Sequence, residues 1–351
     1  CQEYEDSSIL TKISDEYSLI VKNFNFLSLG DSLDTKIALK NIPILKNLIH
    51  GFVKLIFHLK VHREVLRQEA SNILYLETEP LSLLFFRALN SQKMKIIITL
   101  HAVDFDGNHS GVKKIYKLFA RLFIKKISSK ISSFAVHNKR AKERLLNLKV
   151  PETKVFISGW GINKPNIEQK LFDEESINFL AFGVMRKSKR IEELVRLFLE
   201  ADDRRLKLNI VGKSIDIDTI ALEDLIRASN SKTTIKLEDR FIPREDFKEI
   251  FQANDIFVLS HDKTFQSISG PLFNAVESNR PILCFSQADT KKMVIENRLG
   301  ECAEMDELKE ALYEIAKRAI LNYKPDSMNY YLWEEIVLRI KKNLEKNNDF
   351  N

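Results

Sequence analysis

A cluster of cationic side chains follows an apolar run in the second half of the sequence. The run "INFLAFG" ends at Gly183, and Arg186, Lys187, Lys189 and Arg190 come shortly after it. Guanidinium groups bind phosphate oxygens in pairs, and lysine ammonium groups bind them as point charges. Four cations at the end of a strand therefore predict a diphosphate site, with a solvated basic turn as the alternative.

A second turn of interest lies in the segment "TFQSISGPLFNAVESNRPIL". Ser269 and Gly270 precede Pro271, and proline favours the first turn of a helix. The start of a helix presents unpaired N–H groups and a positive dipole end to an anion, and glycine permits close approach. Pro271 removes one donor, so the cradle is poorer than a P-loop. The spacing alone favours ordinary helix capping, and an anion site is the alternative.

The second half of the chain alternates between short apolar runs and helical patterns, and this alternation must position both turns. The predicted strands span residues 177–183, 206–212, 233–237, 255–260 and 281–286. Segments with apolar side chains at helical spacing lie between them. Short apolar strands separated by helices indicate a parallel sheet that is covered on both faces.

The first half repeats the pattern less clearly. Its predicted strands span residues 17–21, 72–76, 95–100, 133–137 and 154–158, and a long helical segment covers 42–70. The opening strand and glycine turn are not evident, as expected for a clipped start. A length of 351 residues fits two doubly wound α/β domains, which meet near residues 161–170. Ligands bind such sheets at the carboxyl ends of strands, so two facing sheets predict a site in a cleft.

Basic residues are concentrated in the first half. Residues 1–165 carry 26 Lys and Arg against 15 Asp and Glu, whereas residues 166–351 carry 29 against 34. The segment 112–149 is especially basic, and it begins with a helical pattern in which apolar and cationic side chains take opposite faces. The apolar members are Ile115, Leu118, Phe119, Leu122, Phe123 and Ile127.

We considered three environments for this helix: the core of its own domain, an anionic membrane and nucleic acid. A surface helix would bury its apolar stripe in the core of its own domain. A helix on an anionic bilayer would instead gain about 1 kcal/mol of attraction for each basic residue. Nucleic acid is not expected as a partner, because no recognition-helix, RRM or zinc-finger pattern accompanies the charge. No run of about 18 uncharged apolar residues exists, so we expect no membrane span.

Several kinds of site lack their sequence patterns. There is no Walker A, GxGxxG or GxSxG motif, and glycine is scarce at 10 residues. The cysteines Cys1, Cys284 and Cys302 are far apart in sequence, which indicates neither a disulfide framework nor a structural zinc site and favours the cytoplasm. Asp-x-Asp triplets at 104–106 and 216–218 could hold Mg²⁺ or Mn²⁺, but the second begins a predicted helix, where acids favour the dipole. We predict no metal site.

Together these segments resemble the retaining sugar-nucleotide glycosyltransferases of the GT-B fold, near glycosyltransferase family 4. "FGVMRKSK" is similar to the family's FGxIRxYKG segment, with Arg190 where glycine is usual. "SGPLFNAVESNRPIL" resembles its SG turn, short helix and proline-led strand, and "IIITLHAVD" resembles its strand with a cleft histidine. "YYLWEEIVLRIKKN" resembles the last helix, which crosses back to the first domain. The resemblance covers roughly residues 70–345.

The resemblance implies an organisation and a set of site residues. The expected parts are an acceptor-side domain over residues 1–165, a nucleotide-sugar domain over 166–325 and a crossover helix over 326–351. The implied catalytic residues are His101, Arg186 and Lys189. The implied donor-binding residues are Gly183, Lys213, Phe241, Ser269, Gly270 and Asn274.

Two positions depart from the family pattern. The family's paired glutamates, eight residues apart, correspond to Gln266 and Asn274. The second glutamate usually holds the donor ribose, and asparagine can still hydrogen-bond a hydroxyl without the charge. This departure motivates a second hypothesis, a non-catalytic GT-B protein that binds a nucleotide, a glycan or a partner. A sugar-nucleotide epimerase is a third.

The main expectation is an enzyme that moves a sugar from a UDP- or GDP-linked donor to an acceptor hydroxyl. The acceptor would be lipid-linked or a glycan, in the synthesis of a surface polysaccharide or glycolipid. Retention of configuration is implied by the resemblance alone. We expect no cofactor and no metal requirement, because the cations can neutralise the diphosphate. The expected location is cytoplasmic, peripheral on the inner face of a membrane whose anionic surface meets residues 112–149.

Overall fold

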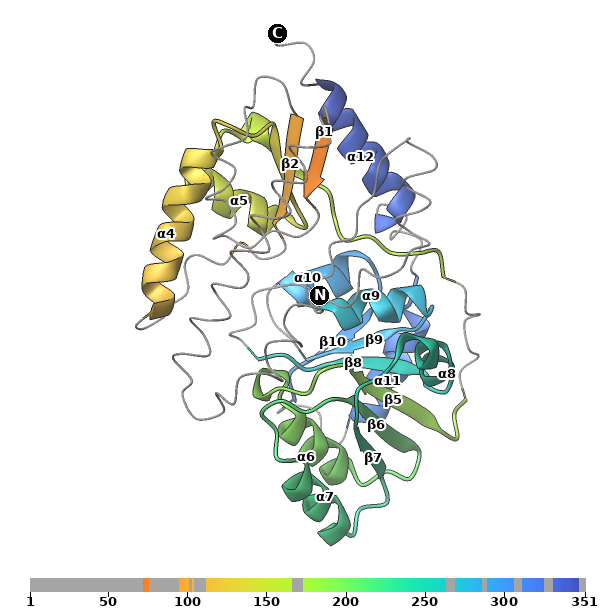
Figure 1. Ribbon diagram of the computed structural model, residues 1–351. Coiled ribbons are helices and arrows are strands. Elements are labelled where there is room, and N and C mark those ends of the chain that lie inside the picture. Colours follow the sequence, from red (N-terminus) through yellow and green to blue (C-terminus); the bar gives the residue numbers. More distant parts are fainter. Residues whose placement is uncertain are drawn as a thin grey trace. The chain divides into compact units, whose positions relative to one another are not determined.

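The chain forms two compact units in a computed structural model (Figure 1). The structure describes residues 72–75, 95–100, 103, 112–165, 173–262, 269–285, 289–305, 311–324 and 331–346. One unit comprises Cys1–Gly159 with Val337–Asn351, and the other comprises Trp160–Ile336. The predicted domain boundaries lie after residues 165 and 325, whereas the chain leaves the first unit after Gly159 and returns to it at Val337.

The first unit contains a parallel sheet in the order β1-β2-β3-β4. The strands are β1 (Asn72–Tyr75), β2 (Lys95–Leu100), β3 (Ser133–Val136) and β4 (Val155–Ile157). β2 and β3 are buried almost throughout, as their continuous apolar sequences predict. The predicted strand at 17–21 and the helical segment at 42–70 lie outside the described residues.

Two helices of this unit lie in the basic segment, α4 (Val112–Ile127) and α5 (Lys139–Asn147). The Asn138 side chain accepts a hydrogen bond from the Ala141 N–H at 2.7 Å and so caps the start of α5. α4 packs on the core through Ile124 and Ile127, which are almost completely buried.

The predicted apolar stripe of α4 does not lie wholly in the core. Leu118 and Leu122 are 56% and 57% exposed. They are four residues apart, so they project from the same face of the helix. Expecting the whole stripe to be buried is therefore wrong for these two leucines.

The second unit is built on a six-stranded parallel sheet in the order β10-β9-β8-β5-β6-β7. The strands are β5 (Ile177–Phe182), β6 (Leu206–Gly212), β7 (Thr234–Asp239), β8 (Ile256–Leu259), β9 (Ile282–Cys284) and β10 (Gly300–Cys302). The direction of winding reverses between β5 and β8, which are hydrogen-bonded neighbours. A doubly wound sheet binds its ligands at such a reversal.

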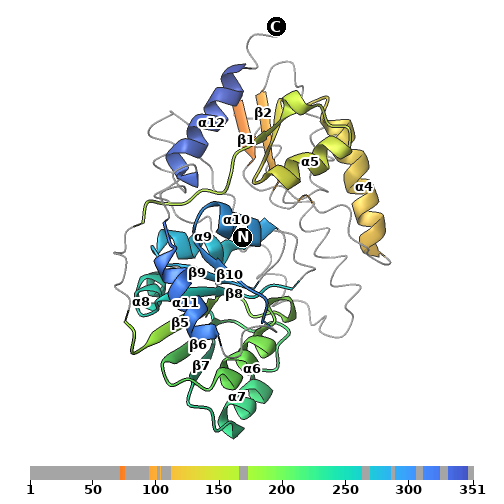
Figure 2. The ribbon, with the colours of Figure 1, turned by 180° about the vertical axis from the view of Figure 1, so that it is seen from behind.

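Helices cover both faces of this sheet (Figure 2). Phe179 of β5 lies in one core cluster and Leu180 in the other, because successive side chains of a strand point to opposite faces. The first cluster includes α6 (Ile191–Ala201), α7 (Thr219–Ala228) and α11 (Leu312–Leu321). The second includes α8 (Phe247–Gln252), α9 (Gly270–Glu277) and α10 (Asp289–Glu296).

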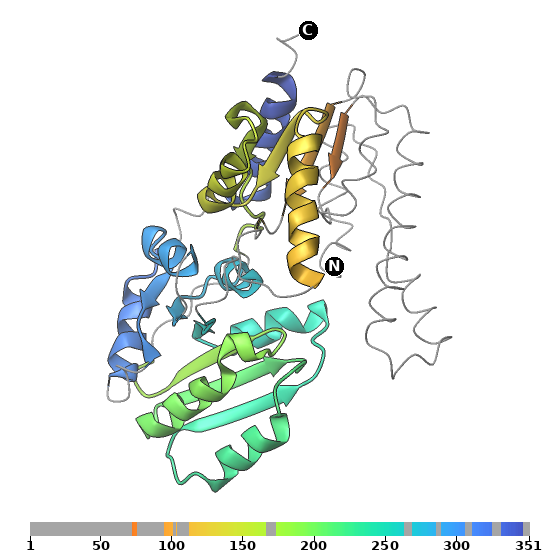
Figure 3. The same cartoon turned by 90° about the vertical axis from the view of Figure 1, so that its left-hand side faces the viewer.

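The last helix, α12 (Trp333–Lys346), begins in the second unit and continues in the first. It is the dark blue helix near the C-terminus in Figure 3. At its start, the Trp333 N–H donates to the Ile162 carbonyl at 3.1 Å. Further along, the Arg339 guanidinium donates twice to the Ser158 carbonyl, at 2.8 and 3.2 Å. Lys95 of β2 donates to the Leu344 carbonyl at 2.7 Å. The helix thus binds to the first unit after the chain has completed the second.

Candidate functional site

The carboxyl ends of β5 and β6 approach closely because a glycine follows β5 and another glycine ends β6. Gly183 has a φ of +90°, which side chains rarely adopt. A Cβ atom on Gly212 would lie 2.1 Å from the Gly183 carbonyl oxygen, so no larger residue fits there without a shift. Beyond the glycines, the Met185 N–H donates to the Lys213 carbonyl at 2.9 Å, so the two turns continue as neighbours.

The basic turn after β5 folds into a short 3-10 helix, η4 (Lys187–Lys189). The Asp216 carboxylate accepts a hydrogen bond from the Lys187 N–H at 2.7 Å. Arg190 then adopts the left-handed conformation, with φ +50°, before α6 begins. That conformation accounts for the glycine usual at this position in the family that the sequence resembles. The turn directs Lys189 back toward the end of β5.

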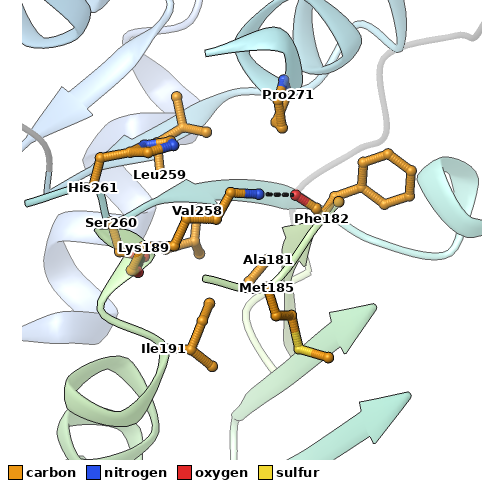
Figure 4. Close-up of a pocket in the computed structure, with 11 residues that line it drawn as sticks. Ala181, Phe182, Met185, Lys189, Ile191, Val258, Leu259, Ser260, His261 and Pro271 are labelled. Carbon is orange, nitrogen blue, oxygen red and sulfur yellow. Dashed lines mark hydrogen bonds between the residues drawn. The ribbon is translucent and has the colours of Figure 1, made fainter. Parts of the chain in front are cut away.

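A pocket opens at the point where β5, β8 and the start of α9 meet (Figure 4). It measures about 290 Å³, including the part that is open to solvent. Gly183, Lys189, His261 and Pro271 contribute to its lining. The Lys189 ammonium lies within the pocket and donates a hydrogen bond to the Phe182 carbonyl at 3.1 Å.

The electrostatics of this pocket are set by a cation that is partly removed from water. Burial, together with the neighbouring Arg186 charge, lowers the pKa of Lys189 from 10.5 to about 8. Lys189 is therefore mostly charged at neutral pH, and its Phe182 partner is a neutral carbonyl rather than a carboxylate. Such a site favours an anionic ligand, whose charge would be stabilised more strongly here than in water.

The segment after β8 is attached to the same turn. The Ser260 hydroxyl donates to the Lys189 carbonyl at 2.5 Å, and the Asp262 N–H donates to the Ser188 carbonyl at 2.8 Å. Between them, His261 is 4% exposed. The pKa of His261 is lowered to about 4, chiefly by burial and then by the Lys189 charge, so the imidazole is neutral at physiological pH.

The start of α9 forms the next side of the site. Ser269 is buried and stands at the N-cap position, yet its side chain makes no capping hydrogen bond. Its hydroxyl lies 3.5 Å from the His261 Nε2 atom instead. A Cβ atom on Gly270 would meet nothing within 4 Å, so the backbone here is open to close approach. Ordinary capping by Ser269, which the spacing favours, is therefore wrong.

The sequence-predicted residues are distributed unequally around this pocket. Gly183 and Lys189 line it, and Arg186 is exposed beside it. Lys213 pairs with the Asp239 carboxylate at 3.0 Å just beyond β6. Phe241, which follows β7, is 63% exposed.

Other predicted residues lie further along α9 or outside the described residues. Asn274 is half-buried in the second turn of α9, where its carbonyl accepts a hydrogen bond from the Ser278 N–H at 3.0 Å. His101 and Gln266 lie outside the described residues. No sequence motif marks His261 as a site residue. Its place directly after a predicted strand is a usable signal, because strand carboxyl ends carry ligand sites.

The second Asp-x-Asp triplet is engaged in local structure. Asp216 accepts the Lys187 N–H, and Asp218 caps α7 by accepting the Ala221 N–H at 3.1 Å. The first triplet, at 104–106, lies outside the described residues. Within the part of the chain that the structure describes, no group of three or more His, Cys, Asp or Glu side chains could hold a metal ion.

No protein-family profile matches the sequence, and no curated protein sequence matches it. Solved structures do match. S. aureus TarM, crystallised with UDP, is similar at a TM-score of 0.58 and 17% identity over 78% of this chain, which spans 56% of TarM. Anabaena HepE with UDP has a TM-score of 0.62 and 12% identity, with 84% of each chain covered.

The lipopolysaccharide outer core galactosyltransferase WaaB gives a TM-score of 0.60 and 11% identity, covering 85% of this chain and 81% of its own. Identities this low establish an architecture rather than an activity. The two parallel sheets, each wound with helices, correspond to the two Rossmann-like domains of these structures. The chain therefore has the GT-B fold.

Proposed function

We propose that this protein is a glycosyltransferase that moves a sugar from a nucleoside diphosphate donor to an acceptor hydroxyl. The observation that carries the proposal is the partly buried Lys189 ammonium in a pocket at the winding reversal of a GT-B sheet. Anabaena HepE, which shares this fold, is known with UDP and with UDP-glucose. A cationic pocket at this point of the sheet suits the diphosphate of such a donor.

Each cation has a role in this proposal. Lys189 and Arg186 stabilise the negative charge that develops on the leaving diphosphate, which is an electrostatic contribution to catalysis. The backbone at Ser269 and Gly270 receives a phosphate at the start of α9. Because the two cations neutralise the leaving group, no metal is required. His101 contacts the donor sugar or the reacting centre, and the reaction retains configuration.

The remaining donor contacts follow from the same orientation of the nucleotide. Asn274, on the second turn of α9, hydrogen-bonds a ribose hydroxyl through its amide. Lys213 and Phe241 follow β6 and β7, so they lie along the same carboxyl edge of the sheet and contact the nucleobase end of the donor. Gly183 keeps the end of β5 free of a side chain.

Nucleotide binding tests the proposal directly. We expect UDP or GDP, but not ADP or CMP, to raise the unfolding temperature, equally with and without Mn²⁺, because ligand that binds only the folded state stabilises it. Arg186→Ala should abolish the shift. Arg227→Ala is the matched control, since Arg227 is an exposed arginine of α7 paired with Glu223. If none of the four nucleotides shifts the transition, the proposed donor site is refuted.

Product analysis then separates the three hypotheses. A glycosyltransferase releases the nucleoside diphosphate by transfer, or slowly by hydrolysis, and Arg186→Ala abolishes this release. An epimerase converts the donor into an isomer without any acceptor. Binding of a nucleotide with no release and no isomer would identify a non-catalytic protein and would direct attention to Gln266 and Asn274.

We also propose that the acceptor is lipid-linked and that α4 rests on an anionic membrane at the cytoplasmic face. The exposed leucines Leu118 and Leu122 lie beside the exposed lysines Lys125 and Lys126. Apolar side chains that enter the headgroup region and cations that meet anionic lipids together suit a helix lying on a bilayer. Within the described residues, no helix is long and apolar enough to cross a membrane.

Vesicle sedimentation tests this second proposal. Vesicles of phosphatidylcholine with phosphatidylglycerol should bind the protein, binding should fall with salt, and pure phosphatidylcholine should bind weakly. Replacing both leucines with asparagine should weaken binding several-fold. The control is Ile220→Asn, which changes a 71% exposed apolar residue on α7. The proposal would be contradicted if Ile220→Asn weakened vesicle binding as much as the double leucine variant does. It would also be contradicted if the protein bound duplex DNA more tightly than the vesicles.

A further inference from the structure

His261 is a buried polar group that belongs to no sequence motif. It follows β8 directly, it is 4% exposed, and it lines the pocket that also contains Lys189 (Figure 4). A histidine this buried, in the lining of a pocket that also contains a cation, is positioned to act on the site rather than to contact bulk water.

The contact of His261 joins two parts of the site. Its Nε2 atom lies 3.5 Å from the Ser269 hydroxyl, and Ser269 immediately precedes the first residue of α9. The contact therefore links the end of β8 to the start of α9. Ser260 and Asp262, on either side of His261, are hydrogen-bonded to the Lys189 turn. One short segment thus touches both the cationic turn and the helix start.

The missing capping hydrogen bond of Ser269 is a second observation that supports a role for this contact. A serine at an N-cap usually accepts a hydrogen bond from its own helix, and this stabilises the helix. Ser269 makes no such bond, although its position is the N-cap of α9. Its hydroxyl faces His261 instead. The Ser269 hydroxyl therefore contacts His261 across the site instead of capping its own helix.

The chemistry of the pair indicates what His261 does. With a pKa of about 4, its imidazole is too weak a base to activate a serine hydroxyl at neutral pH. A neutral ring also adds no second charge that would repel Lys189. What remains is hydrogen bonding, for which one ring nitrogen is a donor and the other an acceptor.

We propose that His261 is a positioning residue, which holds the Ser269–Gly270 turn against the end of β8 at the spacing from Lys189 that a diphosphate requires. This inference rests on the proposed function, because the ligand whose binding it serves is the nucleotide donor. His261 acts through Ser269 and through the turn rather than by forming a bond to the reacting atoms.

A double-mutant cycle on UDP affinity, with GDP in parallel, tests the inference. His261→Ala and Ser269→Ala should each weaken binding roughly three- to tenfold, the range that corresponds to one hydrogen bond. The double variant should bind no more weakly than either single variant, because both remove the same contact. His261→Gln, which retains a hydrogen-bonding group, should keep most of the affinity.

Ser278→Ala is the matched control. It removes a hydroxyl that donates to the Asn274 carbonyl at 2.5 Å at the opposite end of the same helix, so it should leave UDP affinity unchanged. Unfolding without ligand confirms that each variant is folded. Three results would overturn the inference. One is a wild-type UDP affinity in His261→Ala. The others are a double variant whose loss of affinity equals the product of the two single losses, and a His261→Gln variant that binds UDP as weakly as His261→Ala. If the wild-type protein binds neither nucleotide, the proposed function has failed instead.

Discussion

Removing an ammonium group from water, even in part, destabilises a folded protein, and Lys189 is such a group. Its pKa of about 8 lies below the value of 10.5 for an exposed lysine, chiefly because of burial. Its hydrogen-bond acceptor is the Phe182 carbonyl rather than a carboxylate, which would compensate the charge better. A residue that lowers stability while it lines a pocket is typical of a functional site.

Lys189→Met should therefore stabilise the ligand-free protein and remove nucleotide binding. At pH 7 we expect the free energy of unfolding to rise by roughly 1–3 kcal/mol, because a shift of one pKa unit corresponds to about 1.4 kcal/mol. Urea unfolding measures the change in midpoint at constant slope. Lys187→Met, which changes an exposed lysine of the same turn, is the control and should leave the midpoint within about 0.5 kcal/mol of wild type.

The stabilisation by Lys189→Met should depend on pH. The folded state has the lower pKa, so both states are protonated below pH 8 and the full destabilisation is present there. Between pH 8 and 10.5 the unfolded chain holds more protons than the folded one, and wild-type stability rises relative to the variant. The advantage of Lys189→Met should shrink across that range. A constant difference from pH 7 to 10.5 would contradict the assignment of the cost to the Lys189 charge.

At the scale of elements, the site depends on two strand ends that approach more closely than side chains allow. The Gly212 backbone contacts the Gly183 carbonyl, where a Cβ atom would lie at 2.1 Å. The β6 turn can therefore follow the β5 turn, as the contact between Met185 and Lys213 shows.

Gly212→Ala should separate these two turns. We expect the free energy of unfolding to fall by roughly 1–3 kcal/mol, as for other overpacked positions, with weaker nucleotide binding. Gly270→Ala is the control for stability, because it makes the same substitution at a helix start where nothing lies within 4 Å. It should leave the free energy of unfolding unchanged or slightly higher. Equal unfolding midpoints for Gly212→Ala and Gly270→Ala would show that β5 and β6 can separate without loss of stability.

The strands that an apolar pattern marks were predictable from the sequence. β2 has an apolar run and β6 has apolar side chains at alternate positions, and their predicted limits of 95–100 and 206–212 coincide with the observed ones. β10 has the sequence Gly-Glu-Cys and no apolar run, so the sequence did not reveal it. Its place is set by pairing with β9, a contact that no local pattern encodes. The strand order has the same origin, since β5 pairs with β8 across more than 70 residues.

The candidate site could be predicted from the sequence where charged residues or glycines mark it, but not where it depends on packing. Arg186 and Lys189 stand out because four cations follow a strand. His261 is a single histidine without a motif, and its role depends on burial and on the Ser269 hydroxyl. The exposure of Leu118 and Leu122 was likewise unpredictable, because periodicity identifies an apolar face but not what covers it.

At the scale of the whole molecule, α12 ties the end of the chain to the first unit. Arg339 donates two hydrogen bonds to the Ser158 carbonyl, and Ser158 lies next to Gly159, where the first unit ends. The helix begins against Gly161, where the Trp333 ring occupies the space that a side chain would need. Residues remote in sequence therefore stabilise the segment by which the chain passes from one unit to the next.

Arg339→Ala should lower the free energy of unfolding by about 1–3 kcal/mol, because the Ser158 carbonyl loses both donors in a partly buried position. Calorimetry should assign the loss to the transition of the first unit. Lys342→Ala, at an exposed position of the same helix, is the control and should have no effect. An unchanged transition in Arg339→Ala would mean that α12 adds nothing to the first unit through this contact.

The lowered pKa of Lys189 also makes it a nucleophile. With a pKa of about 8, about one molecule in ten carries the neutral amine at pH 7, whereas an ordinary lysine is almost entirely protonated. A neutral amine attacks an aldehyde and forms an imine with loss of water. A small aldehyde would thus label Lys189 in preference to exposed lysines, and bound nucleotide would protect it. The same lysine that lowers the stability of the fold could therefore be labelled selectively by a covalent probe.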